Sequence, residues 1–286
     1  MAAEILSILL VLNLTLAVSI GLVLCLRHPV RRWCGADTVY SLWTVAPIAG
    51  LLIVTFVLIL RMAFIGANDF NPRVATVVLG VWLGGAAIGL SLLVFTERRV
   101  LRLARNGKIG PAVVGVLRPR IHFPADFEIR YTPDEQAMIR AHEVAHLLRH
   151  DVLLNAWVAL AQCILWFNPV VHLAVRYFRH DQEMACDAAV MEDHPEQRRR
   201  YAAAMLKTQL MQCPMGAACG WSGHPLETRI ATLKRGTPPS FLRVTVAMVA
   251  TLLSMTAVIA TLSMSVGVFE QIANIDSGRP AFFVIP

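Results

Sequence analysis

The sequence predicts a mainly α-helical membrane protein: four membrane-spanning helices, and on the cytoplasmic side a helical domain with a small β element. Hydrophobic residues make up 56% of the 286 residues, charged residues only 16%, and the mean hydropathy is +0.58. A soluble globular chain carries roughly 25% charged residues, so this composition argues against a soluble or a disordered protein. Six cysteines without dense pairing do not predict a disulfide framework.

Four apolar stretches are long enough to cross a bilayer, which takes about 20 residues. They cover residues 5–26, 38–60, 74–96 and 244–269. The first lacks the basic start and the small-residue cleavage site of a signal peptide, so we interpret it as a membrane anchor. The predicted organisation is a three-helix membrane region at 1–96, a domain at 97–243, a final membrane helix at 244–269 and a short extracytoplasmic tail at 270–286.

The distribution of Lys and Arg predicts the orientation in the membrane. Basic residues follow the first and third stretches and precede the fourth, whereas the opposite side holds only Arg61, Arg73 and Arg279. The positive-inside rule therefore places the N-terminus outside and residues 97–243 in the cytoplasm. Topology then explains the net charge of +7, and direct nucleic-acid binding is not expected.

A fifth stretch, residues 152–175, has no Asp, Glu, Lys or Arg but is interrupted by Asn168 and Pro169. Proline removes a hydrogen bond from a helix and clashes with the preceding turn. A complete crossing would also separate two charged segments that the motifs below need together. We therefore expect two helices joined near residue 168, forming a hairpin over 152–180 that is buried in protein or dips into the bilayer.

The predicted domain begins with a short β element, which a helix follows. Apolar or alternating runs at 112–117 and 120–123 predict a hairpin or an edge strand. Thr132, Pro133 and Glu135 form a capping box, which predicts a helix that starts at about residue 133.

That helix carries the motif His142-Glu143-Val144-Ala145-His146. Residues four apart lie on one face of a helix, so both imidazoles can bind one metal ion. Zinc suits such a site, and the carboxylate of Glu143 can take a proton from the attacking water and pass it to a leaving amine. By itself, the five-residue motif also occurs on ordinary polar helix faces.

A catalytic zinc needs a third protein ligand, and Glu183 is the candidate. Glu183 and Asp187 lie four residues apart on a helix predicted over 170–191. Glu183 can complete a two-His-one-Glu site for one Zn²⁺ per chain, and Asp187 can accept the ring N–H of a ligand His and fix its tautomer. An isolated Glu/Asp pair is usually a solvated helix face, but its place after the motif and a chain reversal favours the metal site.

Together these motifs resemble the membrane-embedded gluzincin metallopeptidases of the BlaR/MecR antirepressor type, the signal transducers of β-lactam resistance operons. The segments that carry the resemblance are 115–121, 141–146, 149–151, 166–169 and 183–187. It implies a zinc endopeptidase of the bacterial cytoplasmic membrane that acts at the cytoplasmic face. The implied substrate is a regulatory protein such as a DNA-binding repressor, or the protease itself, with the Pro-rich linker at 236–241 as a candidate cleavage site.

The sequence departs from that family after the last predicted span. The antirepressor sensors carry a penicillin-binding domain there, whereas about 17 residues follow Phe269. We therefore expect no acylatable Ser-x-x-Lys sensor and no direct β-lactam sensing by this chain. As partners, the sequence leaves open a separate receptor subunit and a second copy of the chain in a homo-oligomer.

A weaker resemblance concerns residues 223–230. They are similar to the His-Pro…Arg-Ile segment of the CAAX-processing and heat-shock membrane zinc proteases. This resemblance implies that His224 donates a hydrogen bond to the oxyanion on the scissile carbonyl. It also implies that Arg229 supports either the zinc ligands or the oxyanion.

Two other classes of function compete with a protease. A membrane signalling or scaffold subunit would use the zinc for structure or regulation without proteolysis, but a structural site has no need of a general base such as Glu143. A transporter is disfavoured because no inverted repeat is visible and the charged residues concentrate in one predicted cytoplasmic block.

Overall fold

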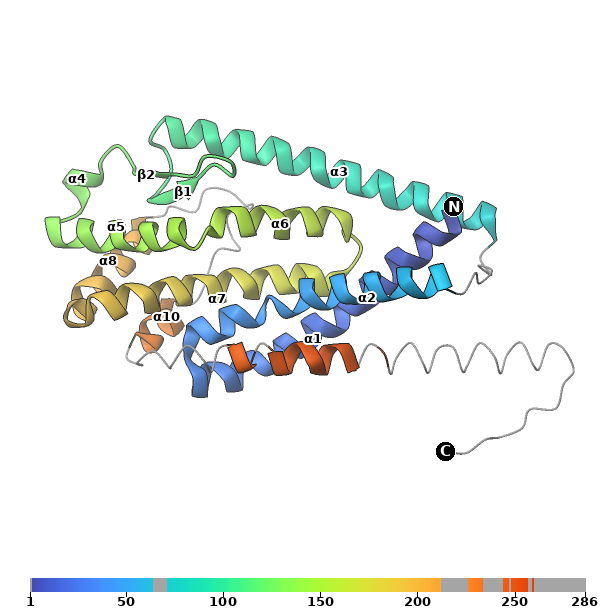
Figure 1. Ribbon diagram of the computed structural model, residues 1–286. Coiled ribbons are helices and arrows are strands. Elements are labelled where there is room, and N and C mark those ends of the chain that lie inside the picture. The colour runs from blue at the N-terminus through green and yellow to red at the C-terminus, as the bar shows by residue number, and fades with distance from the viewer. Residues whose placement is uncertain are drawn as a thin grey trace, which may run out of the picture.

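The computed structural model describes residues 2–63, 71–211, 226–233, 244–246, 248–256 and 259. They form an elongated helical bundle, with the N-terminus at one end and a small sheet and short helices at the other (Figure 1). The elements are α1 (Ala2–Leu42), α2 (Val45–Ala63), α3 (Pro72–Arg105), β1 (Ala112–Val114), β2 (Arg120–His122), α4 (Phe127–Arg130), α5 (Pro133–Leu148), α6 (Asp151–Ile164), α7 (Pro169–Asp193), the 3-10 helix η1 (Pro195–Gln197), α8 (Arg198–Met211) and α10 (Leu226–Thr232).

Helix α1 continues far beyond the first predicted span. It passes through Pro29 and is kinked at Gly35, whose backbone is left-handed with φ 84°. Helix α1 includes residues 38–42, so α2 begins at Val45 and not at residue 38, where the second apolar stretch begins. The run hides this boundary because the turn between the helices, at residues 43 and 44, contains no charge and no proline.

Two of the described helices are long and apolar enough to cross a membrane, Glu4–Leu42 and Pro72–Arg105. They contain the first and third predicted stretches. Shorter apolar helices at Val45–Phe56 and Val244–Thr256 overlap the second and fourth stretches, and half of the fourth stretch lies outside the described residues. The presence of four membrane spans, their orientation in the membrane and the domain boundaries therefore stay predictions.

The chain reversal expected at Asn168 and Pro169 is confirmed. Helix α6 ends at Ile164, and Asn168 caps α7 by accepting a hydrogen bond at 2.9 Å from the backbone N–H of Val170. Helix α7 then runs back along α6 and on to α5, as Figure 1 shows. This return path brings the second half of α7 beside the helix that carries the two motif histidines.

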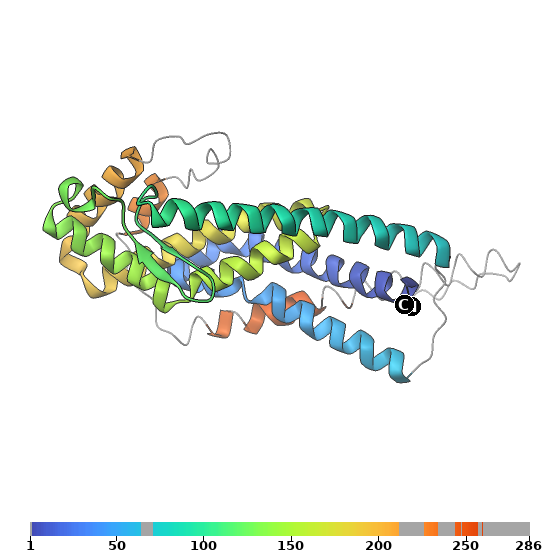
Figure 2. The same cartoon turned by 90° about the horizontal axis from the view of Figure 1, so that it is seen from above.

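The predicted β hairpin is also confirmed. Strands β1 and β2 pair antiparallel, with Val113 opposite Ile121. Seen from above, the hairpin lies against α5 near the end of α3 (Figure 2). It therefore borders the helix that carries the motif.

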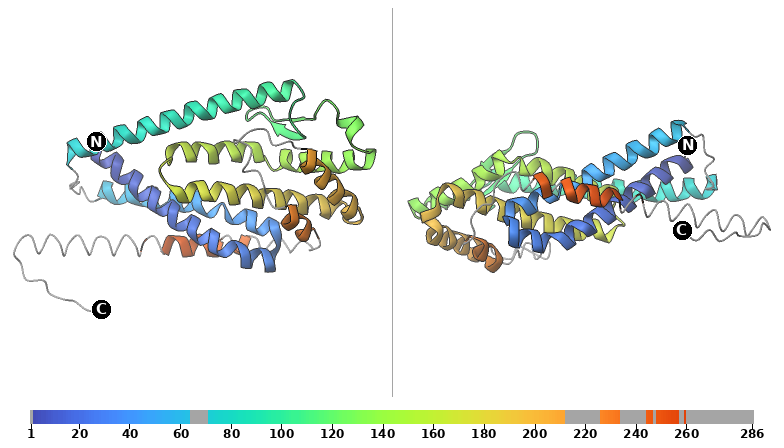
Figure 3. Two further views of the ribbon diagram at one scale, coloured as in Figure 1. Left: turned by 180° about the vertical axis from the view of Figure 1, so that it is seen from behind. Right: turned by 60° about the horizontal axis from the view of Figure 1, so that its bottom comes forward.

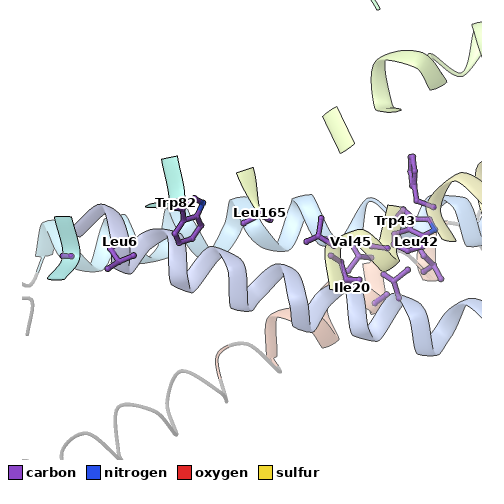
Figure 4. Packing of buried hydrophobic residues seen from close by; sticks show 14 residues of the cluster. Leu6, Ile20, Leu42, Trp43, Val45, Trp82 and Leu165 are labelled. Atoms are coloured by element: carbon purple, nitrogen blue, oxygen red, sulfur yellow. The ribbon is translucent and has the colours of Figure 1, made fainter. Parts of the chain in front are cut away.

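One buried apolar cluster joins the N-terminal helices to α6 and α7. Figure 4 shows it extending from Leu6 and Trp82 to Leu42 and Trp43. A smaller cluster ties α5 to α7 and α8; its buried members are Met138, Val190, Met191, Tyr201, Met205 and Leu233. The N-terminal helices and the motif-bearing helices are thus packed into one body.

Helix α3 packs tightly against the α6–α7 turn at Gly85. The Trp166 indole occupies the space that a Cβ at this position would need, and its Nε1 donates to the carbonyl oxygen of Trp82 at 3.2 Å. The neighbouring Gly84 would place a Cβ with no atom within 4 Å.

We expect Gly85→Ala to lower the thermal unfolding midpoint in detergent, because overpacking costs about 1–3 kcal/mol. Gly84→Ala is the matched control and should leave the midpoint unchanged or raise it, since Ala is favoured over Gly in a helix by about 1 kcal/mol. Equal midpoints for the two variants would contradict the close approach of α3 to Trp166.

Candidate metal centre

Helix α5 presents the motif and begins where the capping box predicts. The backbone N–H of Thr132 donates to Glu135 Oε2 at 2.9 Å, and the backbone N–H of Glu135 donates to Thr132 Oγ1 at 3.4 Å. Lys207 on α8 also donates to Glu135, at 2.9 Å. This end of α5 is therefore fixed both locally and against α8.

The structure brings His142, His146 and Glu183 together. The Nε2 atoms of the two histidines lie 3.0 Å apart. The carboxylate of Glu183 lies 3.4 Å from Nε2 of His142 and 3.5 Å from Nε2 of His146. One donor atom from each residue lies within 4.8 Å of the others, a spacing that suits one small ion with ligand distances of about 2.0–2.2 Å.

The second ring nitrogen of His142 has a partner that fixes its tautomer. The hydroxyl of Tyr201, on α8, donates to Asp187 Oδ1 at 2.6 Å and lies 2.8 Å from His142 Nδ1. Because the hydroxyl hydrogen points to the carboxylate, its oxygen accepts from the Nδ1–H. Asp187 thus reaches His142 through Tyr201, with its own oxygen 3.4 Å from Nδ1. The Nε2 atom keeps its lone pair.

His146 is held in the same tautomer by Asp151. Its Nδ1 lies 2.7 Å from Asp151 Oδ2, and Asp151 is the buried first residue of α6. The sharp turn that puts it there passes through His150, which has a left-handed backbone with φ 56°. Carboxylate partners of this kind orient ligand histidines and strengthen them as ligands.

The donor set fits a bound cation. Both Nε2 lone pairs point at each other across 3.0 Å, with the Glu183 carboxylate beside them. Two lone pairs and an anionic oxygen repel unless a proton or a metal ion lies between them. Two imidazoles and one carboxylate are a ligand set that zinc accepts.

The electrostatics of the site favour positive charge at this point. Burial opposes protonation of His146, but the hydrogen bond to Asp151 and the charges of Glu183 and Glu143 raise its pKa to about 9. Burial likewise opposes ionisation of Glu183, yet His142 and Arg229 hold the pKa of Glu183 well below its usual range. A field that draws a proton to His146 draws a divalent cation too.

A second group of donors shares His146. Cys186, Asp151 and the Nδ1 side of His146 also lie within 4.8 Å of one another. Burial, followed by the charge of Asp151, raises the pKa of the Cys186 thiol, which then keeps its proton. A protonated thiol is a poor metal ligand, so the set with Glu183 is the better candidate.

Arg229, on α10, supports the carboxylates of the site. Its guanidinium donates to Asp187 at 2.7 and 2.8 Å, and it lies 3.2 Å from Glu183 Oε2. This geometry fits the first of its two implied roles, support of the ligands. His224, the implied oxyanion donor, and the linker at 236–241 lie outside the described residues.

Glu143 is buried beside the donors, with 6% of its surface exposed. Burial raises its pKa against the opposing effect of the two neighbouring histidines. It lines a cavity of about 380 Å³ that the three donor residues and Ala112 and Val113 of β1 also border. The cavity thus combines a proton acceptor, a candidate metal position and a strand.

Sequence reasoning missed Tyr201 and Asp151. Asp151 stands in a segment that carries the family resemblance, five residues after His146, and this proximity was a usable signal. Tyr201 follows three arginines that mark only a charged helix edge. Its role depends on how α8 packs on α5 and α7, which no local pattern reveals.

Comparison with known proteins finds one family that this chain resembles. Residues 96–233, a little under half of the chain, match the model of a peptidase family. The family is described as BlaR1 peptidase M56, and the matched range contains every described candidate site residue. The resemblance to the BlaR/MecR type is thereby confirmed.

Individual relatives agree with the family match. The chain is 34% identical over 82 residues to "Regulatory protein BlaR1" of Bacillus licheniformis, which covers 29% of this chain and 14% of the relative. It is 26% identical over 103 residues to "Methicillin resistance mecR1 protein" of Staphylococcus aureus and Staphylococcus epidermidis, covering 36% of this chain and 18% of each relative. The chain thus matches less than a fifth of the length of these relatives. No solved structure matches it.

Proposed function

We propose that this protein is an integral-membrane zinc endopeptidase that cleaves a protein substrate at the cytoplasmic face, in signal transduction. The observation that supports this most strongly is the pair of opposed Nε2 atoms beside the Glu183 carboxylate. The buried Glu143 on the same helix adds the proton acceptor that hydrolysis needs.

Each side chain of the site then has a task. His142, His146 and Glu183 hold one Zn²⁺, which when bound supplies Lewis-acid chemistry at a carbonyl and acidifies water. Glu143 accepts the proton of the attacking water and returns it to the leaving amine. Arg229 keeps Glu183 ionised and in place, and we assign oxyanion stabilisation to His224 by resemblance alone.

The cavity suits an extended peptide. Within the described residues, β1 pairs with β2 alone, and Ala112 and Val113 of β1 border the cavity. Peptides commonly bind by adding a strand to a sheet edge. A regulatory protein such as a repressor, or the linker at 236–241 of the protease itself, would have to enter as an unfolded segment.

Metal removal tests the proposal. The full-length protein in detergent should cleave members of a random peptide library, lose this activity in a zinc chelator, and regain it when zinc but not magnesium is added. Mass spectrometry of the protein itself under the same conditions reads out cleavage at 236–241. A stoichiometrically zinc-loaded protein that cleaves nothing would favour the scaffold function, and absence of cleavage at 236–241 alone would end the self-cleavage proposal.

A further inference from the structure

A hydrogen-bonded path links helix α1 to the candidate metal centre. The hydroxyl of Tyr40 donates to Asp151 Oδ1 at 2.9 Å, and Asp151 Oδ2 lies 2.7 Å from His146 Nδ1. Tyr40 belongs to the last turn of α1 and lies near the end of the candidate membrane span Glu4–Leu42. Figure 3 shows α1 crossing the bundle towards the end that carries the site.

The direction of the Tyr40 hydrogen bond is fixed by a second partner. Gln182 Nε2 donates to the Tyr40 oxygen at 3.0 Å, and Asn155 donates to the side-chain oxygen of Gln182 at 3.0 Å. The Tyr40 hydrogen is therefore left for Asp151, a carboxylate that is 1% exposed. With one oxygen held by Tyr40 and the other by His146, the plane of the Asp151 carboxylate cannot rotate freely.

Buried ion pairs attach α1 firmly to the helices of the site. Asp181, two residues before Glu183, accepts from Arg27 at 2.8 and 3.1 Å and from Arg31 at 2.6 Å. It also accepts from the indole Nε1 of Trp43 at 3.0 Å and has no exposed surface. Charges buried in this way are costly to separate, so α1 and α7 cannot shift relative to each other without breaking these contacts.

A further pair connects α1 to the end of α5. Asp37 lies 2.8 Å from an Arg149 nitrogen, and the Arg149 guanidinium lies over the Tyr40 ring at 4.6 Å. Arg149 is the C-cap of α5, three residues after His146. Helix α1 therefore contacts two residues near His146: Asp151, through Tyr40, and Arg149, through Asp37.

The two ligand histidines differ in this respect. His142 is supported by Tyr201, Asp187 and Arg229, which all belong to the helices that follow α6. His146 is supported by Asp151, which accepts from Cys186 of α7 and also from Tyr40 of α1. We propose that Tyr40 is a positioning residue of the metal centre, through which helix α1 sets the orientation of His146. The proposal rests on the proposed zinc site.

Tyr40→Phe tests this, with Tyr177→Phe as the matched control. Tyr177 lies at the same α1–α7 interface, where Arg27 stacks on its ring, but within the described residues its hydroxyl has no hydrogen-bond partner. In the full-length protein, we expect Tyr40→Phe to weaken zinc binding by about tenfold, the lower limit for groups that orient a ligand. Competition with a chelator measures the zinc affinity. The visible absorption of Co²⁺ bound in the site should change in Tyr40→Phe and stay unchanged in Tyr177→Phe.

A double-mutant cycle separates positioning from a general loss of stability. If Tyr40 acts through Asp151, then Tyr40→Phe should have little further effect on zinc affinity in an Asp151→Ala background. Additive effects would overturn the proposal, as would equal zinc affinity and Co²⁺ spectra in Tyr40→Phe and wild type. If Asp151→Ala does not fold, the comparison of the two Tyr→Phe variants decides by itself.

Failure of the wider proposal has a different signature. A well-folded wild-type protein that binds no zinc would remove the metal site itself, and the Tyr40 proposal with it. Zinc bound normally by wild type and by Tyr40→Phe would remove the positioning role alone.

Discussion

Glu143→Gln is expected to abolish peptide hydrolysis while the zinc content stays at about one ion per chain. Gln has the shape of Glu, so the cavity and helix α5 should be retained. It cannot accept a proton from water, and a positioned general base contributes about 10²–10⁴ in rate. The zinc should stay because the three proposed ligands, His142, His146 and Glu183, are untouched.

The measurement is peptide cleavage together with elemental analysis of the same sample. Glu135→Gln is the matched control, the same chemical change on the same helix. A capping box accepts Gln in place of Glu, so this variant should keep both zinc and activity. Hydrolysis by Glu143→Gln at more than about a tenth of the wild-type rate would exclude Glu143 as the general base.

Local patterns were sufficient to predict the elements of the site. The start of α5 follows from a capping box four residues long, and the reversal before α7 follows from Asn168 and Pro169. The approach of Glu183 to the histidines required only that the chain reverse once and that both helices keep a regular period. Each of these signals is contained in a short segment, so it can be read without knowledge of the fold.

The partners of the site were harder to predict because they depend on long-range packing. The basic residues that follow the first apolar stretch include Arg27 and Arg31, and both are buried on Asp181, about 150 residues further along the chain. A charge pattern counts basic residues but does not say which carboxylate each one meets. The end of α1 was hard to predict for the same reason. Beyond residue 26 the helix carries polar side chains, and whether it continues depends on their long-range contacts.

Some predictions concern the membrane and the substrate, which are not part of the folded chain. The orientation of the helices, the four spans and the identity of the substrate all concern the surroundings of the protein. Residues 223–225, which carry the weaker resemblance at His224, and the linker at 236–241 fall outside the described part of the chain.

Glu183→Ala should reduce the zinc content from about one ion per chain to a small fraction. Loss of a group that only orients a ligand already costs about 10–100-fold in metal affinity, and loss of the ligand itself should cost more. Without the carboxylate, the two Nε2 atoms 3.0 Å apart can share a proton instead of a metal ion. Asp187 is held by Tyr201 and Arg229, so it is poorly placed to take over.

Elemental analysis of the purified protein measures this effect, with Glu192→Ala as the matched control. Glu192 lies on the same helix α7, but it is exposed and distant in sequence from the motif. The control should keep the wild-type zinc content, because the charge of one exposed carboxylate is screened by solvent. Equal zinc loss in both variants would point to a general effect on α7, and full zinc retention by Glu183→Ala would show that the third ligand is another residue. Loss confined to Glu183→Ala would instead assign the ligand to a single carboxylate, the one that Arg229 holds in place.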